Sequence, residues 1–156
     1  MKKDAKESAK EIRRVLGQSW PGVKFSVRVK RFAGGSSVHV NWMDGPTEKE
    51  VRRATNHLKG WDEGYYNEYI STSRRHSREA MEAAAKAVAE YYGVPVPEVV
   101  GGDSPYIADY TDTDGELLCD RIHHATWRTS LYNVDIAKAF DEALPAAGEQ
   151  MVRQYF

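Results

Sequence analysis

Residues 23–42 constrain the fold more than any other part of the chain. Every second residue is apolar from Val23 to Val29 and again from Val38 to Trp42, and two glycines separate these runs. Such alternation predicts two half-buried strands, because neighbouring side chains of a strand point to opposite faces of a sheet. A glycine pair between two strands is typical of a tight turn that needs positive φ angles. We therefore expect a β-hairpin with one apolar face.

The turn also predicts how the two strands pair. If Gly34 and Gly35 are its central residues, Val29 lies opposite Val40. The turn length stays open, but a shift by one residue would move the apolar side chains to the wrong face. The opposite face of the hairpin is polar and is expected to carry Lys24, Ser26, Arg28, Lys30, His39 and Asn41.

The glycine pair could instead belong to a phosphate-binding loop. A nucleotide-binding loop of this kind needs the pattern G-x-x-x-x-G-K-[ST], running from a strand into a helix N-terminus. Here two serines and a second strand follow the glycines, and the lysine is absent. We therefore interpret the pair as a turn.

Helical patterns surround the hairpin. Ala5, Ala9, Ile12 and Leu16 share one face of a helix expected over residues 3–17, and Gly17 is expected to end it. A threonine and a glutamate three residues apart, just after the hairpin, predict a second helix that starts with a capping box. The other expected elements are a short strand near 68–73, a helix at about 77–92, and two helices within 115–145.

Together these elements predict an α+β fold. It has an N-terminal helix, a small antiparallel sheet of about three strands with the Gly-Gly hairpin, helices packed on one face, and a helical C-terminal part. Residues 1–95 are expected to form one domain, with 96–156 as a helical extension packed on it. A single domain over 1–156 is the alternative.

Charge is distributed unevenly along the chain. Residues 1–60 contain 14 Lys and Arg against 6 Asp and Glu, whereas residues 61–156 contain 8 against 17. This polarity fits a nucleic-acid-binding surface on the basic part. It also fits two halves that attract each other, either within one chain or across a homodimer.

The composition also predicts where the protein acts. No apolar run approaches the ~20 residues that cross a membrane, and the N-terminal residues lack the apolar centre of a signal peptide. One cysteine, Cys119, leaves no intrachain disulfide. We expect a cytoplasmic protein with no membrane partner.

The basic face of the hairpin is the best candidate for a binding site. Lys and Arg side chains there would make salt-sensitive contacts with phosphates, and a two-stranded ribbon fits the major groove of DNA. The alternatives are an ordinary solvated sheet face, or one covered by the acidic half of the chain. The candidate nucleic-acid-binding residues are Lys24, Arg28, Lys30, His39, Arg52 and Arg53.

An aromatic segment is the candidate surface for a protein partner. Trp61, Tyr65, Tyr66 and Tyr69 lie within nine residues that glycine also punctuates. Large aromatic side chains with a polar edge are frequent at interfaces, although they are also frequent in cores.

Two clusters contain residue types that bind metals or support catalysis. Cys119 and His123 are four residues apart, but zinc needs further ligands, and a nucleophilic cysteine needs an orienting group and an oxyanion hole. The segment 110–121 resembles a calcium loop, but Tyr110 and Arg121 stand where carboxylates are required. We expect no metal, no cofactor and no enzymatic activity.

The hairpin and its flanks resemble the large polyvalent protein-associated domains. The motifs F-S-V-R, G-G-S-S and W-x-D-G-P-T follow one another in the order strand, turn, strand and helix cap. Ala33 and Met43 stand where the family pattern suggests serine and threonine. The resemblance covers about residues 5–95. Such domains occur in long proteins of bacteriophages and conjugative elements and as small free-standing proteins, and we expect the second kind.

The resemblance implies a phage or mobile-element protein that acts in the bacterial host cytoplasm, in counter-defence or host take-over. It supplies no reaction, so no catalytic residue is carried over. We expect a non-catalytic module that binds a host protein. The alternative is an accessory protein that binds DNA or RNA through the basic face of the 23–42 hairpin.

Overall fold

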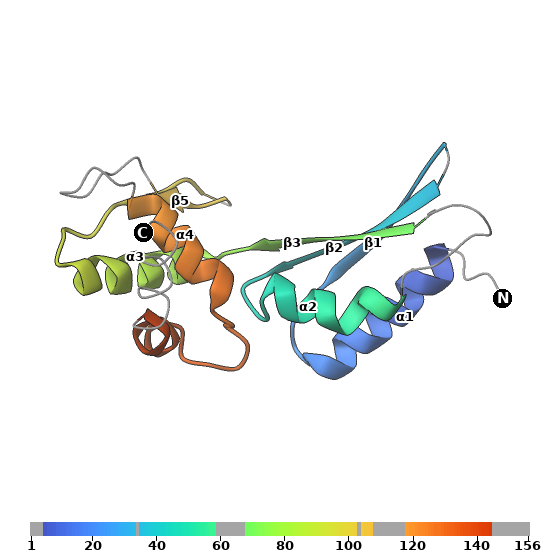
Figure 1. Ribbon diagram of the computed structural model, residues 1–156, viewed down its shortest axis with the longest axis horizontal. Helices are drawn as coiled ribbons and strands as arrows, with labels where there is room; N and C mark the ends of the chain where they lie inside the picture. The colour runs from blue at the N-terminus through green and yellow to red at the C-terminus, as the bar shows by residue number, and fades with distance from the viewer. Residues whose placement is uncertain (1–4, 34, 59–67, 103, 108–117, 145–156) are drawn as a thin grey trace, which may run out of the picture. The chain divides into compact units, whose positions relative to one another are not determined.

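The computed structural model describes residues 5–33, 35–58, 68–102, 104–107 and 118–144 (Figure 1). The chain divides into two compact units, Met1–Arg75 and His76–Phe156. The α+β class is confirmed, with an N-terminal helix, a three-stranded sheet, a small hairpin and a helical C-terminal part. The domain boundary expected after residue 95 stays a prediction.

The first unit contains a three-stranded sheet with the strand order β1-β2-β3, so β2 is central. Figure 1 shows helices α1 and α2 on the same side of this sheet. The helices and strands are α1 (Ala5–Ser19), β1 (Ser26–Phe32), β2 (Gly35–Met43), α2 (Glu48–Thr55), the short 3-10 helix η1 (Asn56–Leu58) and β3 (Glu68–Arg75).

The two helices begin and end for different local reasons. Helix α1 was expected to end at Gly17, but it continues to Ser19 because Gly17 does not adopt a positive φ and the Trp20 amide still donates to the Leu16 carbonyl. The capping box before α2 is confirmed. The Thr47 hydroxyl accepts from the Glu50 amide, and the Glu50 carboxylate accepts from the Thr47 amide.

The hairpin is confirmed, but its predicted register is wrong by two residues. Val29 pairs with Val38 rather than Val40, and Phe32 pairs with Gly35. The strands are therefore paired as far as Phe32 and Gly35 rather than Ala33 and Ser36. A shift by two leaves every side chain on its predicted face, because side chains alternate with a period of two. The apolar pattern alone therefore could not distinguish the two registers.

The third strand corrects the expected sheet topology. Strand β3 pairs with β2 in parallel, from Ser36 beside Glu68 to Met43 beside Arg75. The sheet is therefore mixed rather than antiparallel throughout. Its two parallel strands are joined through helix α2, as the connection between parallel neighbours requires a crossover. Strand β3 lies beside almost the whole length of β2.

The core of the first unit lies between the helices and one face of the sheet. Val38, Val40 and Trp42 are almost completely buried and form the centre of this face. This confirms that the alternating apolar residues point inward together. The buried members of the core are Ala9, Ile12, Leu16, Val27, Val38, Val40, Trp42, Val51 and Leu58.

The second unit has a separate core around helix α3 (Arg78–Tyr92), which begins at the cap residue Ser77 and ends at Gly93 with φ 67°. Alanine, leucine and isoleucine side chains of α3 and α4 (Leu118–Arg128) supply much of the core. Residues 136–144 are also helical, as expected. Two short strands, β4 (Val99–Val100) and β5 (Tyr106–Ile107), form a small antiparallel pair.

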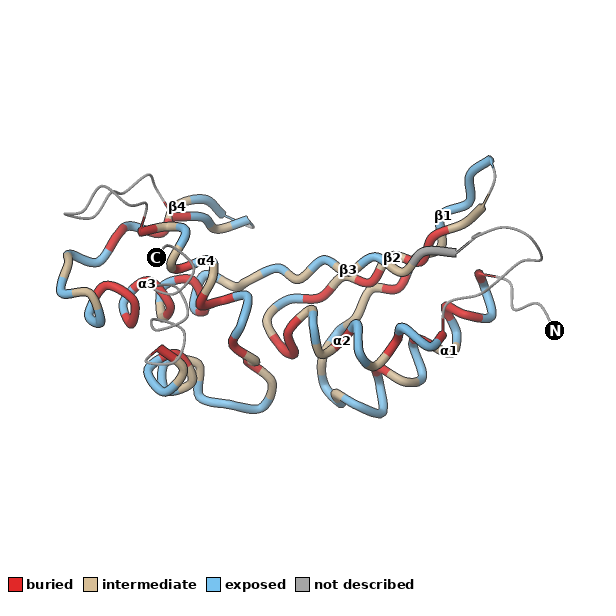
Figure 2. The backbone as a smooth tube through the Cα atoms, in the orientation of Figure 1, coloured by how far each residue is buried: buried red, intermediate tan, exposed pale blue. Residues whose placement is uncertain are grey.

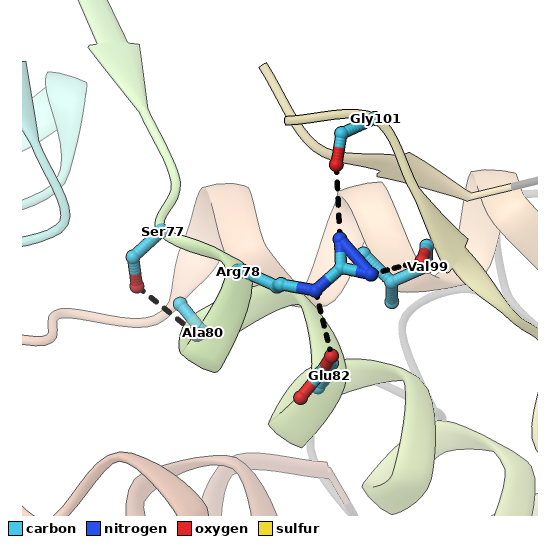
Figure 3. A network of polar contacts seen from close by, with 6 residues as sticks. All are labelled: Ser77, Arg78, Ala80, Glu82, Val99 and Gly101. Atoms are coloured by element: carbon cyan, nitrogen blue, oxygen red, sulfur yellow. Dashed lines mark hydrogen bonds and ion pairs between the residues drawn. The ribbon is translucent and has the colours of Figure 1, made fainter. Parts of the chain in front are cut away.

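Arg78 ties this strand pair to the start of α3 (Figure 3). Its guanidinium donates to the carbonyls of Val99 and Gly101, both at 2.9 Å, and its Nε lies 3.1 Å from a Glu82 carboxylate oxygen. A planar guanidinium can satisfy several acceptors at once. Arg78 is therefore a structural cation of the second unit.

Candidate nucleic-acid interface

The sheet of the first unit has one face that no described element of this unit covers. Because side chains alternate along a strand, the residues between the buried valines point to this side. We call it the open face. Exposed positions recur along β1 and β3 in Figure 2. Its described residues are Ser26, Arg28, Lys30, Phe32, Gly35, Ser37, His39, Asn41, Met43, Ser71, Ser73 and Arg75.

The open face is positively charged. Arg28, Lys30 and Arg75 are all exposed, and no described carboxylate forms an ion pair with any of them. The twelve described positions of the face include no Asp or Glu. Lys24 lies just before β1 and is exposed as well. These cations are therefore available to an anionic ligand, since no carboxylate of the described residues competes for them.

His39 occupies the centre of the open face and is held by two hydroxyl groups. Its Nδ1 lies 2.7 Å from the Ser71 hydroxyl, and its Nε2 lies 3.0 Å from the Ser37 hydroxyl. Arg28 is its direct neighbour on β1. A neutral imidazole has one donor and one acceptor nitrogen, and a hydroxyl can serve as either partner. These two contacts fix the ring orientation across β2 and β3.

The structure brings only some of the predicted residues together. Arg28, Lys30 and His39 share the open face, whereas Arg52 and Arg53 lie on α2, which packs on the other side of the sheet. The Arg52 Nε donates to the Thr72 hydroxyl at 3.1 Å, so this side chain faces the helical side. Arg52 and Arg53 are therefore not part of the open face.

The sequence did not place Ser71, Ser73 and Arg75 on the basic face, because the expected strand near 68–73 had no assigned partner. The parallel pairing puts Ser71 beside His39 and Arg75 beside Met43. The strand–helix–strand order was a usable signal, since such a connection usually gives parallel neighbours. Counting in twos along β3 would then have placed Arg75 on the same face as Ser71 and Ser73.

The W-x-D-G-P-T segment has a structural role in this unit. The Trp42 indole donates to the Pro46 carbonyl at 2.9 Å, and the Arg74 guanidinium donates to the Asp44 and Gly45 carbonyls at 2.9 and 3.0 Å. Asp44 and Gly45 both have positive φ. Burial lowers the pKa of Arg74 to about 10, against an opposing effect of the Asp44 carboxylate. Arg74 therefore stabilises the connection between β2 and α2 by hydrogen bonds to its backbone.

The candidate partner-binding residues lie mostly outside the described residues. This holds for Trp61, Tyr65 and Tyr66. Tyr69 belongs to β3 and pairs with Ser37, but its side chain is not among those described. The aromatic surface therefore stays a prediction.

Helix α4 carries the cysteine and histidines of one candidate metal cluster. Cys119 is half-buried and His123 is exposed. The Nδ1 atom of His124 is buried and has no hydrogen-bond partner, and burial together with Arg128 lowers the His124 pKa. Within the described ranges, no three His, Cys, Asp or Glu side chains are grouped as a metal site would require.

Among the residues that the structure describes, no helix is both long and apolar enough to span a membrane.

Comparison with known proteins identifies the family. Residues 3–95 match the model of the large polyvalent protein associated domain 29. A search of curated proteins found no match, and a search of solved structures found none either. The matched segment covers more than half of the chain and includes the whole sheet, its two helices and helix α3. The chain therefore belongs to the large polyvalent protein associated domain 29 family.

Proposed function

We propose that the first unit binds nucleic acid through the open face of its sheet, without catalysing a reaction. The observation that carries this proposal is the set of Arg28, Lys30 and Arg75 on a face that has no described carboxylate. Lys and Arg side chains without internal partners can neutralise phosphates and release their counterions. Seryl and amide side chains between the cations add hydrogen-bonding groups for phosphate or sugar oxygens.

The family gives this activity a biological setting. The domain belongs to a group found in polyvalent proteins of phages and mobile elements. An accessory role of such an element in a bacterial host, in counter-defence or host take-over, is part of the proposal. Binding of a host protein through Trp61, Tyr65, Tyr66 and Tyr69 stays a prediction.

The proposal is tested by reversing the charge of the open face. Arg28→Glu combined with Lys30→Glu should weaken binding to single-stranded and double-stranded oligonucleotides by at least about tenfold, because two phosphate contacts become repulsive. The matched control is Lys49→Glu with Arg53→Glu. This pair makes the same change in charge on exposed positions of α2.

Fluorescence anisotropy would measure the affinities, and circular dichroism would verify that both variants fold. Equal affinities of the Arg28/Lys30 variant and the unmodified protein would refute the proposal. Affinity capture from a bacterial lysate tests the alternative role. One host protein retained after nuclease treatment would favour protein binding, whereas partners lost on nuclease treatment would favour nucleic acid.

A further inference from the structure

The width of the sheet restricts the nucleic acid that the open face can bind. Lys30 pairs with Ser37, and Ser37 pairs with Tyr69 of the third strand, so the basic part of the hairpin is nowhere a free two-stranded ribbon. Adjacent strands lie about 4.8 Å apart, so the outer backbones are separated by about 10 Å before side chains are added. A major groove about 12 Å wide admits a two-stranded ribbon. The backbone of the three-stranded face is about twice as wide as such a ribbon, which favours a flexible single strand over the groove of a duplex.

An exposed aromatic side chain lies at the end of the same face. Phe32 is 46% exposed and belongs to neither hydrophobic core. Its partner across the hairpin is Gly35, which has no side chain to cover the ring. Lys30 precedes it by two residues and therefore points to the same side. A phenylalanine beside an exposed lysine is suited to stacking a base whose phosphate the lysine neutralises.

The centre of the face provides polar contacts at fixed positions. The His39 ring is held between two hydroxyls, that of Ser37 on the same strand and that of Ser71 on β3. Ser71 is exposed, so its hydroxyl keeps hydrogen-bonding capacity for a ligand beyond the imidazole contact, whereas Ser37 is buried and orients the ring. The exposed hydroxyl and the imidazole can contact the Watson–Crick edges of unpaired bases, which pairing hides in a duplex.

We propose that the open face selects single-stranded over double-stranded nucleic acid, with the strand following Arg28 and Lys30 and one base stacked on Phe32. This inference rests on the proposed function and specifies its ligand. A continuous sheet with cations and an exposed aromatic ring can track a flexible backbone, and stacking tolerates any base because each has a π-face. The DNA and RNA forms share this chemistry.

The experiment compares oligo(dT) and oligo(rU) of about 12 nucleotides with a duplex of the same length, near the site size of sheet-based single-strand binders. Fluorescence anisotropy of the full chain should show binding of at least one single strand about tenfold or more tighter than binding of the duplex. Phe32→Ala should weaken single-strand binding by about 5- to 100-fold, because one base loses its stacking partner.

Two controls separate stacking from other effects. Phe32→Tyr should keep the affinity within about twofold, because the ring is retained, whereas Phe32→Leu should behave like Phe32→Ala. Tyr106→Ala removes an aromatic side chain of the second unit that is 56% exposed, and it should leave binding unchanged. The dependence of affinity on salt should be the same with and without Phe32, because no phosphate contact is lost.

The results distinguish this inference from the proposed function. Duplex affinity equal to that of both single strands, or an unchanged affinity of Phe32→Ala, would overturn the single-strand inference. If, in that case, the Arg28→Glu/Lys30→Glu variant still loses affinity for nucleic acid, the proposed function is retained without the preference for single strands. If that charge-reversed variant binds as well as the unmodified protein, the proposed function is overturned and the inference falls with it.

Discussion

The salt dependence of binding can be derived from the cations of the open face. Arg28, Lys30 and Arg75 are exposed and have no ion-pair partner among the described residues. If each neutralises one phosphate of a single strand, the logarithm of the association constant falls against the logarithm of salt concentration with a slope of about −2. Raising the salt concentration fourfold, for example from about 50 to 200 mM, should then weaken binding about 20-fold.

Replacing two of these cations predicts a smaller slope. In the Arg28→Ala/Lys30→Ala variant one phosphate contact remains, so the slope should be about −0.7 and the same change of salt should weaken binding only about threefold. The comparison variant is Lys49→Ala with Arg53→Ala, which removes the same charge from helix α2. Its slope should equal that of the unmodified protein, because α2 lies on the opposite side of the sheet.

The assay is a set of anisotropy titrations with oligo(dT) at four or more salt concentrations for each protein. Affinity at one salt concentration is insufficient, because a loss of affinity does not identify its cause. Equal slopes for the Arg28/Lys30 variant and the unmodified protein would refute the reasoning. A slope reduced instead in the Lys49/Arg53 variant would place the phosphate contacts on α2 rather than on the sheet.

Two further predictions concern stability and are measured by chemical denaturation. Alanine should have opposite effects at two glycines where its added methyl group would meet open space. Gly93→Ala should lower the free energy of unfolding by about 1–2 kcal/mol, because the φ angle of Gly93 is 67°. Gly17→Ala should raise the free energy of unfolding by ~0.5 kcal/mol, because Gly17 lies within helix α1. Equal signs would contradict the assigned conformations. Thr47→Ala should lower the free energy of unfolding by ~1 kcal/mol and Thr47→Ser by much less, because only alanine removes the capping oxygen. Equal losses of stability in the two variants would contradict the capping role.

Local patterns predicted much of the first unit. The alternation of Val27, Val38 and Val40 identified the buried face, and by exclusion the exposed face with Arg28 and Lys30. The capping pattern that begins at residue 47 also predicted the start of α2. These features depend on side chains that are close together in sequence, and the period of a strand or helix determines which of them share a face.

Pairing between distant segments could not be predicted in the same way. Both hairpin registers keep the apolar residues on one face, so the periodicity could not reveal that Phe32 lies opposite Gly35. The partner and direction of β3 depend on the crossover through α2, and they place Ser71 and Arg75 on the open face. The candidate interface is therefore a product of tertiary pairing, although its first two cations were evident in the hairpin.

Of the three motifs that indicated the family, W-x-D-G-P-T acts mainly next to the sheet rather than on the proposed interface. Trp42, Asp44 and Gly45 act in the connection between β2 and α2, where the indole and the Arg74 guanidinium hold backbone carbonyls. Such a motif reports the fold rather than the ligand. The proposed binding therefore depends on the charges of the open face and not on this motif.

The central claim is that nucleic acid lies on the open face, and photo-cross-linking tests it most directly. An oligo(rU) containing 4-thiouridine would be irradiated with the full chain, and the linked peptides identified by mass spectrometry. We predict cross-links at Phe32, His39 and neighbouring residues of β1, β2 and β3. Cross-links confined to helix α2, to the segment of Tyr65 and Tyr66, or to the second unit would contradict the account.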